Sequence, residues 1–124
     1  MALLVVDASA VAALLFLEPE ADEVVERLRG HDLVAPQLLA YEIANVAAMR
    51  VRRRLTSPGA AATAIDLFRR LDVRLHPVDA ARAFEAATRT GLTAYDGAYL
   101  WLARALGSKL VTLDRRLERA ARAE

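Results

Sequence analysis

The stretch Leu3-Leu4-Val5-Val6-Asp7 opens the chain with four apolar residues and an acid directly behind them. A short continuous apolar run of this kind is typical of a strand that is buried on both faces of a sheet. Near the other end, Leu110-Val111-Thr112-Leu113-Asp114 repeats the pattern. Because α/β sheets bind ligands outside the carboxyl ends of their strands, we expect both acids at the functional edge of the sheet.

Between these two runs, helical and extended patterns alternate. Strands are predicted at residues 3–6, 32–35, 73–76 and 109–113. Helices are predicted at residues 9–17, 21–29, 37–54, 58–71, 80–89, 94–106 and 114–123. Alternation on this scale predicts a mostly parallel sheet covered by helices on both faces, and a single α/β domain over residues 1–124.

The composition excludes several classes of protein. With 56% hydrophobic and 27% charged residues, the chain is expected to be ordered and globular. It has no cysteine, so disulfides and thiolate metal sites are excluded. No apolar run approaches the ~18–20 residues of a membrane span, and the opening Met1-Ala2-Leu3-Leu4 lacks the basic start of a signal peptide. We therefore expect a cytoplasmic protein.

The net charge of +1 indicates no global basic field for nucleic acid, but the arginines are unevenly distributed. Four of them cluster at Arg50, Arg52, Arg53 and Arg54. Arginine binds phosphate bidentately, so this cluster is able to hold a nucleic-acid backbone. Cations at a helix end also complement the helix dipole, and this second interpretation is the one we favour for the cluster alone.

Four acids, Asp7, Glu42, Asp96 and Asp114, lie beside core-like residues. An ionised carboxylate is costly to desolvate unless it is paired or bound to a metal, so together they suggest a shared metal site. Three of them also have structural explanations. Asp7 and Asp114 are good N-caps for the helices that follow them, and Asp96 follows Thr93 by three residues, as in a capping box. Both interpretations stay open for these three.

Glu42 is harder to explain as a structural residue. Several apolar residues lie within about 60° of it on a helix that advances 100° per residue: Leu38, Leu39, Val46 and Met49. The sequence therefore places a carboxylate at the centre of the apolar face, with Asn45 beside it. Because a solvent-facing glutamate would lie on the opposite side, we favour a functional role for Glu42.

Crowded carboxylates repel one another and raise each other's pKa, and a hard divalent cation removes that repulsion. All-oxygen ligands favour Mg²⁺ or Mn²⁺ over Zn²⁺. His31 and His76 neighbour none of the acids and are interpreted as structural or surface residues. Because such metal sites typically serve phosphate chemistry, phosphodiester hydrolysis fits best.

Four motifs resemble those of the PIN-domain ribonucleases, specifically the VapC-type toxins of prokaryotic toxin–antitoxin pairs. They lie at residues 4–20, 35–45, 92–103 and 110–117, in the order of the family and over nearly the whole chain. The resemblance implies a three-layer α/β/α domain with a central, mostly parallel sheet of four to five strands. One departure is Gly97, where the family usually carries Ala or Ser; it is expected to weaken its helix by up to ~1 kcal/mol.

The resemblance also implies what the residues do. Asp7, Asp96 and Asp114 would ligate Mg²⁺ or Mn²⁺ directly or through water, and Glu42 would complete the negative pocket. Three further residues would orient carboxylates or water: Ser9, Thr112 and, less clearly because it is able to bond locally, Asn45. The expected activity is that of an endoribonuclease, the expected partners are an RNA substrate and a cognate antitoxin, and a homodimer is implied.

Two other functions are compatible with an acidic α/β domain. A phospho-accepting receiver domain also has an acidic Mg²⁺ pocket, but it needs a lysine at the end of its last strand, and Lys109 is at the start of one. A catalytically silent PIN-like module that binds RNA or protein is the second rival. Acids at all four positions favour the enzyme over that module.

Overall fold

The computed structural model describes residues 2–123. Its sheet contains four strands: β1 (Leu3–Val6), β2 (Asp32–Pro36), β3 (Arg74–His76) and β4 (Lys109–Val111). Their order is β3-β2-β1-β4, and all three pairings are parallel. The predicted α/β class and parallel sheet are therefore confirmed.

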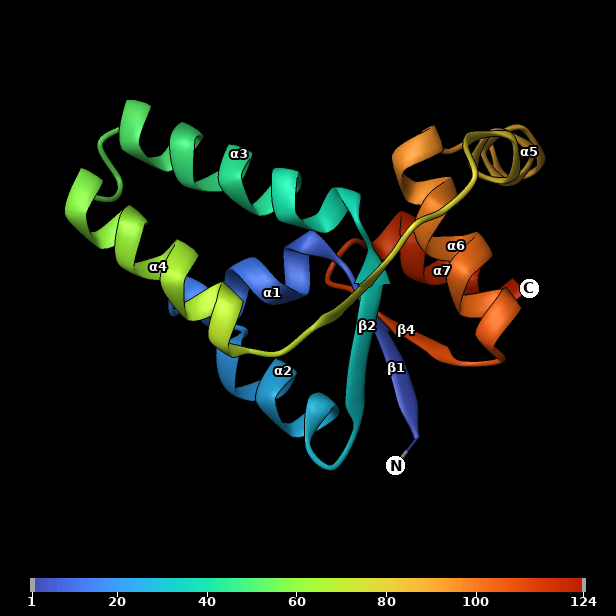
Figure 1. Cartoon of the computed structure of the whole chain (residues 1–124), viewed down its shortest axis with the longest axis horizontal. Helices are drawn as coiled ribbons and strands as arrows, with labels where there is room; N and C mark the ends of the chain where they lie inside the picture. Colours follow the sequence, from blue (N-terminus) through green and yellow to red (C-terminus); the bar gives the residue numbers. More distant parts are fainter. Residues whose placement is uncertain (1, 124) are drawn as a thin grey trace.

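Helices cover both faces of this sheet (Figure 1). On one side lie α1 (Ala8–Leu15), α2 (Ala21–Leu28), α3 (Leu38–Arg52) and α4 (Pro58–Arg70). On the other side lie α5 (Ala80–Thr90), α6 (Ala94–Leu106) and α7 (Arg115–Ala123). This is the three-layer α/β/α arrangement that the sequence predicted.

The strand order puts a topological switch point between β1 and β4. The chain leaves β1 toward β2 and β3 on one side and returns to β4 on the other. Val6 at the end of β1 pairs with Val111 at the end of β4. Open α/β sheets bind ligands at such a point, outside the carboxyl ends of the strands. The first and last strands of the sequence thus end side by side.

Two helices end two residues earlier than predicted, for a local backbone reason. The first was expected to reach Leu17, but Leu17 has a left-handed backbone (φ 52°) and α1 ends at Leu15. The third was expected to reach Arg54, which is also left-handed (φ 59°), and α3 ends at Arg52. A helix of L-residues is not able to continue through that conformation.

The last strand is also shorter than the predicted 109–113. β4 ends at Val111 because the next amides bond to side chains instead of a neighbouring strand. The Leu113 amide donates to the Ser9 hydroxyl and the Asp114 amide donates to the Thr112 hydroxyl. Asp114 therefore precedes α7 rather than beginning it.

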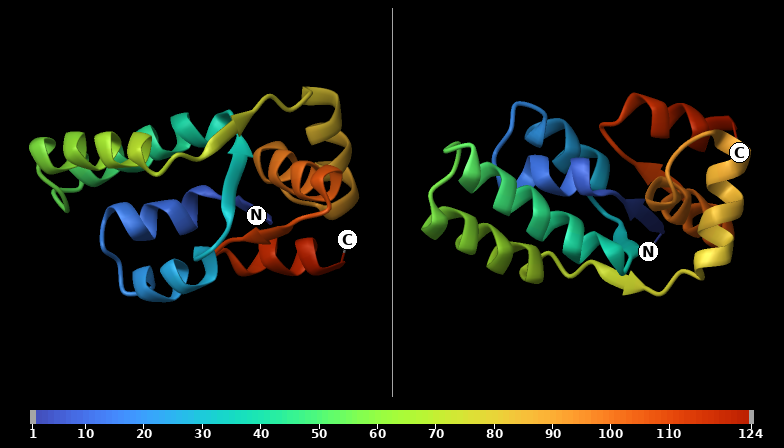
Figure 2. Two further views of the ribbon diagram at one scale, coloured as in Figure 1. Left: turned by 60° about the horizontal axis from the view of Figure 1, so that its bottom comes forward. Right: turned by 90° about the horizontal axis from the view of Figure 1, so that it is seen from above.

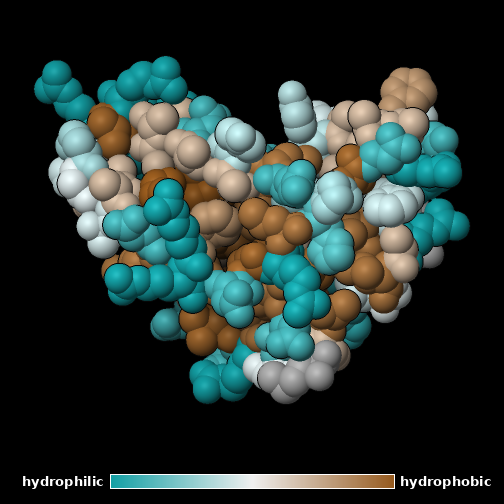
Figure 3. Space-filling view, in the orientation of Figure 1, coloured by the Kyte–Doolittle hydropathy of each residue, from teal (hydrophilic) through white to brown (hydrophobic). Residues whose placement is uncertain are grey.

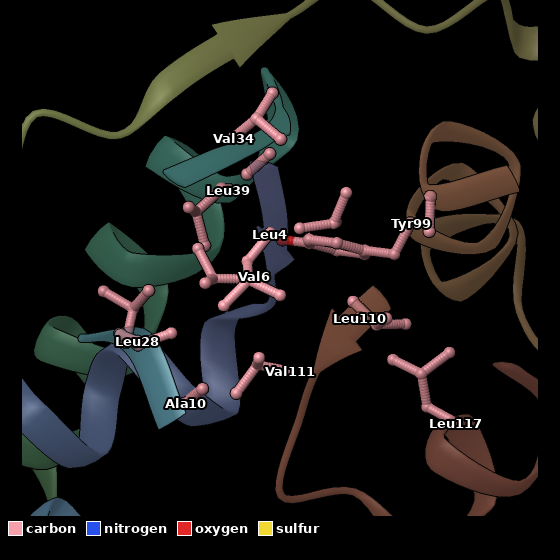
Figure 4. Packing of buried hydrophobic residues seen from close by; sticks show 14 of the residues in the cluster. Leu4, Val6, Ala10, Leu28, Val34, Leu39, Tyr99, Leu110, Val111 and Leu117 are labelled. Carbon is pink, nitrogen blue, oxygen red and sulfur yellow. The ribbon is translucent and has the colours of Figure 1, made fainter. Parts of the chain in front are cut away.

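The hydrophobic core joins the sheet to the helices on both sides (Figure 4). Val5, Val6 and Val34 of the central strands are fully buried. Tyr99 of α6 is also buried, at 2% exposure, and its ring extends toward the strands. The core thus includes one buried aromatic residue, Tyr99, whose hydroxyl is polar.

Helices α3 and α4 form an antiparallel pair that extends away from the sheet (Figure 2). Arg50 fixes the outer part of this pair to the rest of the molecule. Its guanidinium lies 4.6 Å from the centre of the Phe16 ring, donates to the Thr56 hydroxyl at 2.9 Å and lies 3.7 Å from a Glu18 oxygen. Arg50 therefore has a structural role in a cluster for which the sequence left two interpretations.

Gly97 has a packing role that the sequence did not indicate. A Cβ at this position would clash with the Ala83 carbonyl oxygen of α5 and lie 3.1 Å from the Ala87 amide nitrogen. The absence of a side chain therefore lets α5 and α6 approach closely, which offsets the lower helix propensity of glycine. Among residues 2–123, no helix is long and apolar enough to cross a membrane.

Candidate active site

A notch in the molecular surface separates α3 from the α5–α6 pair (Figure 3). It lies over the end of the sheet toward which the strands point (Figure 1). Helix α3 carries Glu42 in its first turns, and α6 carries Asp96 in its first turn. Asp7 follows β1, and Asp114 follows β4 by three residues. All four predicted acids therefore come from segments that meet at this edge.

Asp7 is the most buried of the four, at 6% exposure. Its amide donates to the Val111 carbonyl, which extends the β1–β4 pairing by one bond. Its Oδ1 caps α1 by accepting from the Ala10 amide at 3.1 Å. The same oxygen accepts from the Ser9 hydroxyl at 2.8 Å, and Oδ2 accepts from the Thr112 hydroxyl. Asp7 is thus an N-cap and a fixed, inward-facing carboxylate at once.

The Ser9 and Thr112 hydroxyls connect Asp7 to the segment after β4. Each donates to one Asp7 oxygen and accepts a backbone amide, from Leu113 at 2.8 Å and from Asp114 at 3.0 Å. The two hydroxyl oxygens are 3.3 Å apart. This network connects the Asp7 carboxylate to the backbone that carries Asp114, and the orienting role of the two hydroxyls stays a prediction.

Asp114 caps the last helix. Its Oδ1 accepts from the amides of Arg116 at 2.9 Å and Leu117 at 3.2 Å. The capping explanation considered for this residue is therefore correct for one of its oxygens. Asp114 is exposed, so its carboxylate also remains accessible to solvent and solutes.

Glu42 is half-buried and lies at the edge of the buried stripe of α3, which is a correction to its predicted place at the centre. The fully buried residues of that helix are Leu39, Ile43 and Ala47. Glu42 lies about 100° from Ile43 on the helix, on the side that reaches α6. There its Oε1 accepts a hydrogen bond of 2.7 Å from the hydroxyl of Tyr99.

Tyr99 was not assigned to the site from the sequence. The available signal was its place on α6, three residues after Asp96 and therefore close to it on the helix surface. Burial, followed by the charge of Glu42 and the hydrogen bond to it, raises the pKa of the Tyr99 hydroxyl. The hydroxyl therefore stays protonated and donates to Glu42.

Asp96 lies at the start of α6 and is half-buried. Its amide donates to the Thr93 hydroxyl at 3.1 Å, so Thr93 is the N-cap, as the capping-box interpretation expects. Within the described part of the chain, the Asp96 carboxylate itself has no hydrogen-bond donor. The Asp96 amide is thus bonded to the capping residue Thr93, whereas its carboxylate is free to bind a ligand.

Electrostatic repulsion connects the four acids in pairs, each to the next. Burial raises the pKa of Asp7 against the lowering effect of its three hydrogen bonds, and the charge of Asp114 raises it further. Burial likewise raises the pKa of Glu42, the Tyr99 hydrogen bond opposes this, and the charges of Asp7 and Asp96 add to the rise. Repulsion therefore links Asp114 to Asp7, Asp7 to Glu42, and Glu42 to Asp96.

The remaining predicted residues lie differently. The Asn45 side chain is exposed and donates to the Met49 sulfur at 3.6 Å, which is the local bonding considered as its alternative. The His31 ring lies 2.9 Å from the Arg29 carbonyl oxygen, and His76 belongs to β3. The structure does not bring these three side chains into the chain of interacting acids.

The four carboxylates suit a hard divalent cation in chemistry and charge. They offer only oxygen ligands, and a cation would relieve their mutual repulsion. As they stand, no three Asp, Glu or His side chains within residues 2–123 converge closely enough to ligate one ion. Mg²⁺ usually binds to one or two carboxylates and retains several waters, so the arrangement fits a partly water-mediated site.

A second hollow, of about 790 Å³, lies alongside β4, between that strand and α2, α6 and α7. None of the four acids lines it. Its lining is apolar with a basic rim, and the one acid in it, Glu118, is paired with Arg122 at 2.6 Å. It offers no carboxylate cluster, so the notch at the carboxyl edge, toward which the four acids are carried, is the candidate active site.

Comparisons with known proteins point to one family. The sequence model of the PIN domain matches residues 4–123. Ribonuclease VapC3 of Pyrobaculum aerophilum is 39% identical, over 92% of this chain and 91% of that protein. Ribonuclease VapC12 of Mycobacterium tuberculosis is 34% identical, over 93% of this chain and 89% of that protein. The crystal structure of PAE2754 from P. aerophilum superimposes with a TM-score of 0.77 and 26% identity, over 96% of this chain and 86% of that one.

Proposed function

This chain belongs to the PIN-domain family, among its VapC ribonucleases, and we propose that it hydrolyses RNA at a divalent metal held by Asp7, Glu42, Asp96 and Asp114. It is an endoribonuclease of the toxin type. The observation that carries the metal proposal is the placement of the acids: Asp7 and Asp114 follow two neighbouring strands at the switch point, and Glu42 and Asp96 lie in the first turns of α3 and α6. Four carboxylates repel one another there unless a cation lies between them.

The expected mode of metal binding differs among the four acids, because their surroundings differ. Asp7 is held by three donors and is the most rigid candidate ligand. Asp114 and Asp96 are more open to solvent, which suits ligands that act through water. Glu42 completes the pocket from α3. When bound, Mg²⁺ or Mn²⁺ supplies an activated water and stabilises the negative charge that develops on the phosphate.

Ser9 and Thr112 orient the Asp7 carboxylate and the backbone that carries Asp114. Hydroxyls that hold a metal-binding carboxylate typically change metal affinity or activity by 10–100-fold when they are removed. Asn45 takes this role only if its side chain leaves the Met49 sulfur, so we keep it as the weakest candidate.

The proposed partners follow from the same pocket. A cognate antitoxin would block it by presenting a basic side chain to the four carboxylates, in competition with metal and RNA. We also propose that the chain is one PIN-like domain over residues 1–124 and acts as a cytoplasmic homodimer. Light scattering gives the molar mass of the protein alone, which tests the homodimer, and of its mixture with the antitoxin, which tests the complex.

The test of the proposal is cleavage of single-stranded RNA with each metal. The purified protein is expected to cut RNA with Mg²⁺ or Mn²⁺, to stop when EDTA is added, and to lose activity as Asp96→Asn. Binding of RNA without cleavage under any of these conditions, unaffected by EDTA, would contradict the enzyme and support a silent binding module instead.

A further inference from the structure

The three tyrosines of the chain lie close to candidate-site acids, but only one is buried. Tyr41 precedes Glu42 and is 81% exposed, and Tyr95 precedes Asp96 and is 66% exposed. Tyr99 is 2% exposed, and its hydroxyl reaches Glu42, which lies 57 residues earlier in the chain. The buried tyrosine therefore connects α6 to α3 across the candidate active site.

Filling the core does not explain the hydroxyl of Tyr99. The ring packs among apolar side chains of the strands (Figure 4), where phenylalanine would supply nearly the same volume and apolar area. A buried hydroxyl costs free energy unless it finds a partner. The partner here is the carboxylate of a candidate ligand rather than a backbone carbonyl. The hydroxyl is thus explained by its hydrogen bond to Glu42 and not by the packing of the core.

Glu42 depends on this one contact. Asp7 receives three hydrogen bonds, and Asp114 caps a helix through two amides. For Glu42, Tyr99 is the single hydrogen-bond donor found in the described part of the chain. A glutamate has three side-chain torsions, so without that donor its carboxylate would sample several positions.

We propose that Tyr99 is a positioning residue of the active site, which holds the Glu42 carboxylate in place by hydrogen-bonding to its Oε1. This inference rests on the proposed metal-dependent ribonuclease function. With Oε1 held, Oε2 is the oxygen that remains for the metal or its water. Functional side chains must be held to within about 0.5 Å, and neighbours that lock their rotamers provide this.

The experiment compares Tyr99→Phe with Tyr95→Phe. Both variants lose one phenolic hydroxyl from the same helix, but that of Tyr95 is exposed and makes no hydrogen bond among the described residues. The substrate is a mixed-sequence pool of single-stranded RNA with a fluorescent reporter, and Mn²⁺ is titrated in each case. Thermal unfolding of each variant shows whether the fold is retained.

Tyr99→Phe is expected to lower kcat by about 10–100-fold and to raise the Mn²⁺ concentration for half-maximal rate, with KM for RNA nearly unchanged. Tyr95→Phe is expected to match the wild type. In a Glu42→Gln background, the Tyr99 change is expected to add little further loss, because its target is already altered.

Two outcomes overturn the inference alone. One is an active wild type and a Tyr99→Phe variant whose kcat and Mn²⁺ dependence stay within twofold of it. The other is a loss of equal size in the Glu42→Gln background, which would assign Tyr99 a purely structural role. A folded wild type that cuts no RNA with either metal overturns the proposed function, and this inference with it.

Discussion

The two halves of the candidate active site are held together in different ways. The β1–β4 half, with Asp7, Asp114 and two hydroxyls, is fixed by several short-range caps and bonds between neighbouring strand ends. The α3–α6 half, with Glu42 and Asp96, is joined by one long-range hydrogen bond from Tyr99. A carboxylate at a strand end is thus positioned by backbone pairing, whereas one on a helix depends on how the helices pack.

The largest expected effect comes from the best-held acid. Asp7→Asn retains an N-cap for α1 but removes the buried charge, and it is expected to lower kcat by about 10³-fold, since metal stabilisation of a transition state is worth several kcal/mol. RNA cleavage assays measure this. The control is Asp32→Asn, an exposed acid at the start of β2, which should stay active. Equal activity of the two variants would remove Asp7 from the site.

Next in size is the loss of the hydroxyl between Asp7 and Asp114. Thr112→Val keeps the side-chain shape but removes a donor to Asp7 and an acceptor of the Asp114 amide. The expected loss of activity is about 10–100-fold. Ser9→Ala is expected to cost less, because the Ala10 amide still holds Asp7 Oδ1. If Ser9→Ala proves the more damaging in the same assay, the β1–β4 half is not held as described.

Gly97→Ala tests the packing on which the α3–α6 half depends. The new Cβ would clash with the Ala83 carbonyl, and we expect a loss of about 1–3 kcal/mol in the free energy of unfolding, measured by urea denaturation. Gly59→Ala is the matched control: its Cβ would meet nothing within 4 Å in α4, so it should be neutral or stabilising by about 0.5–1 kcal/mol. The same loss in both variants would refute the close α5–α6 contact.

The smallest effect is a pH-dependent gain in stability. The pKa of Glu42 in the folded protein is raised above its ordinary 4.5. The free energy of unfolding therefore falls as pH rises from the ordinary value through the raised one, because the folded state loses this proton less readily than the unfolded state. In EDTA, Glu42→Gln is therefore expected to melt a few degrees above the wild type at pH 7. The gain should vanish below about pH 4, where the wild-type carboxyl is protonated in both states. A gain that is independent of pH would exclude the charge as its cause.

The sequence by itself determined the element types, the parallel sheet and the positions of the acids along the chain. Apolar runs and alternating periods are local properties of the backbone and side chains, so they can be interpreted without contacts. The caps were also predictable, since Asp7 lies one residue before α1 and Asp114 one before α7. The element ends were less so, because a left-handed Leu17 or Arg54 leaves no sign in the composition.

Only the tertiary structure decided which groups meet. The pairing of β1 with β4 joins Asp7 to Thr112 across 105 residues, and a side-chain hydrogen bond between α6 and α3 joins Tyr99 to Glu42 across 57. Sequence periodicity describes one element at a time, so it placed Glu42 at the centre of its apolar face when the helix buries a neighbouring stripe. Contacts between elements depend on strand order and helix packing, which are set by the fold as a whole.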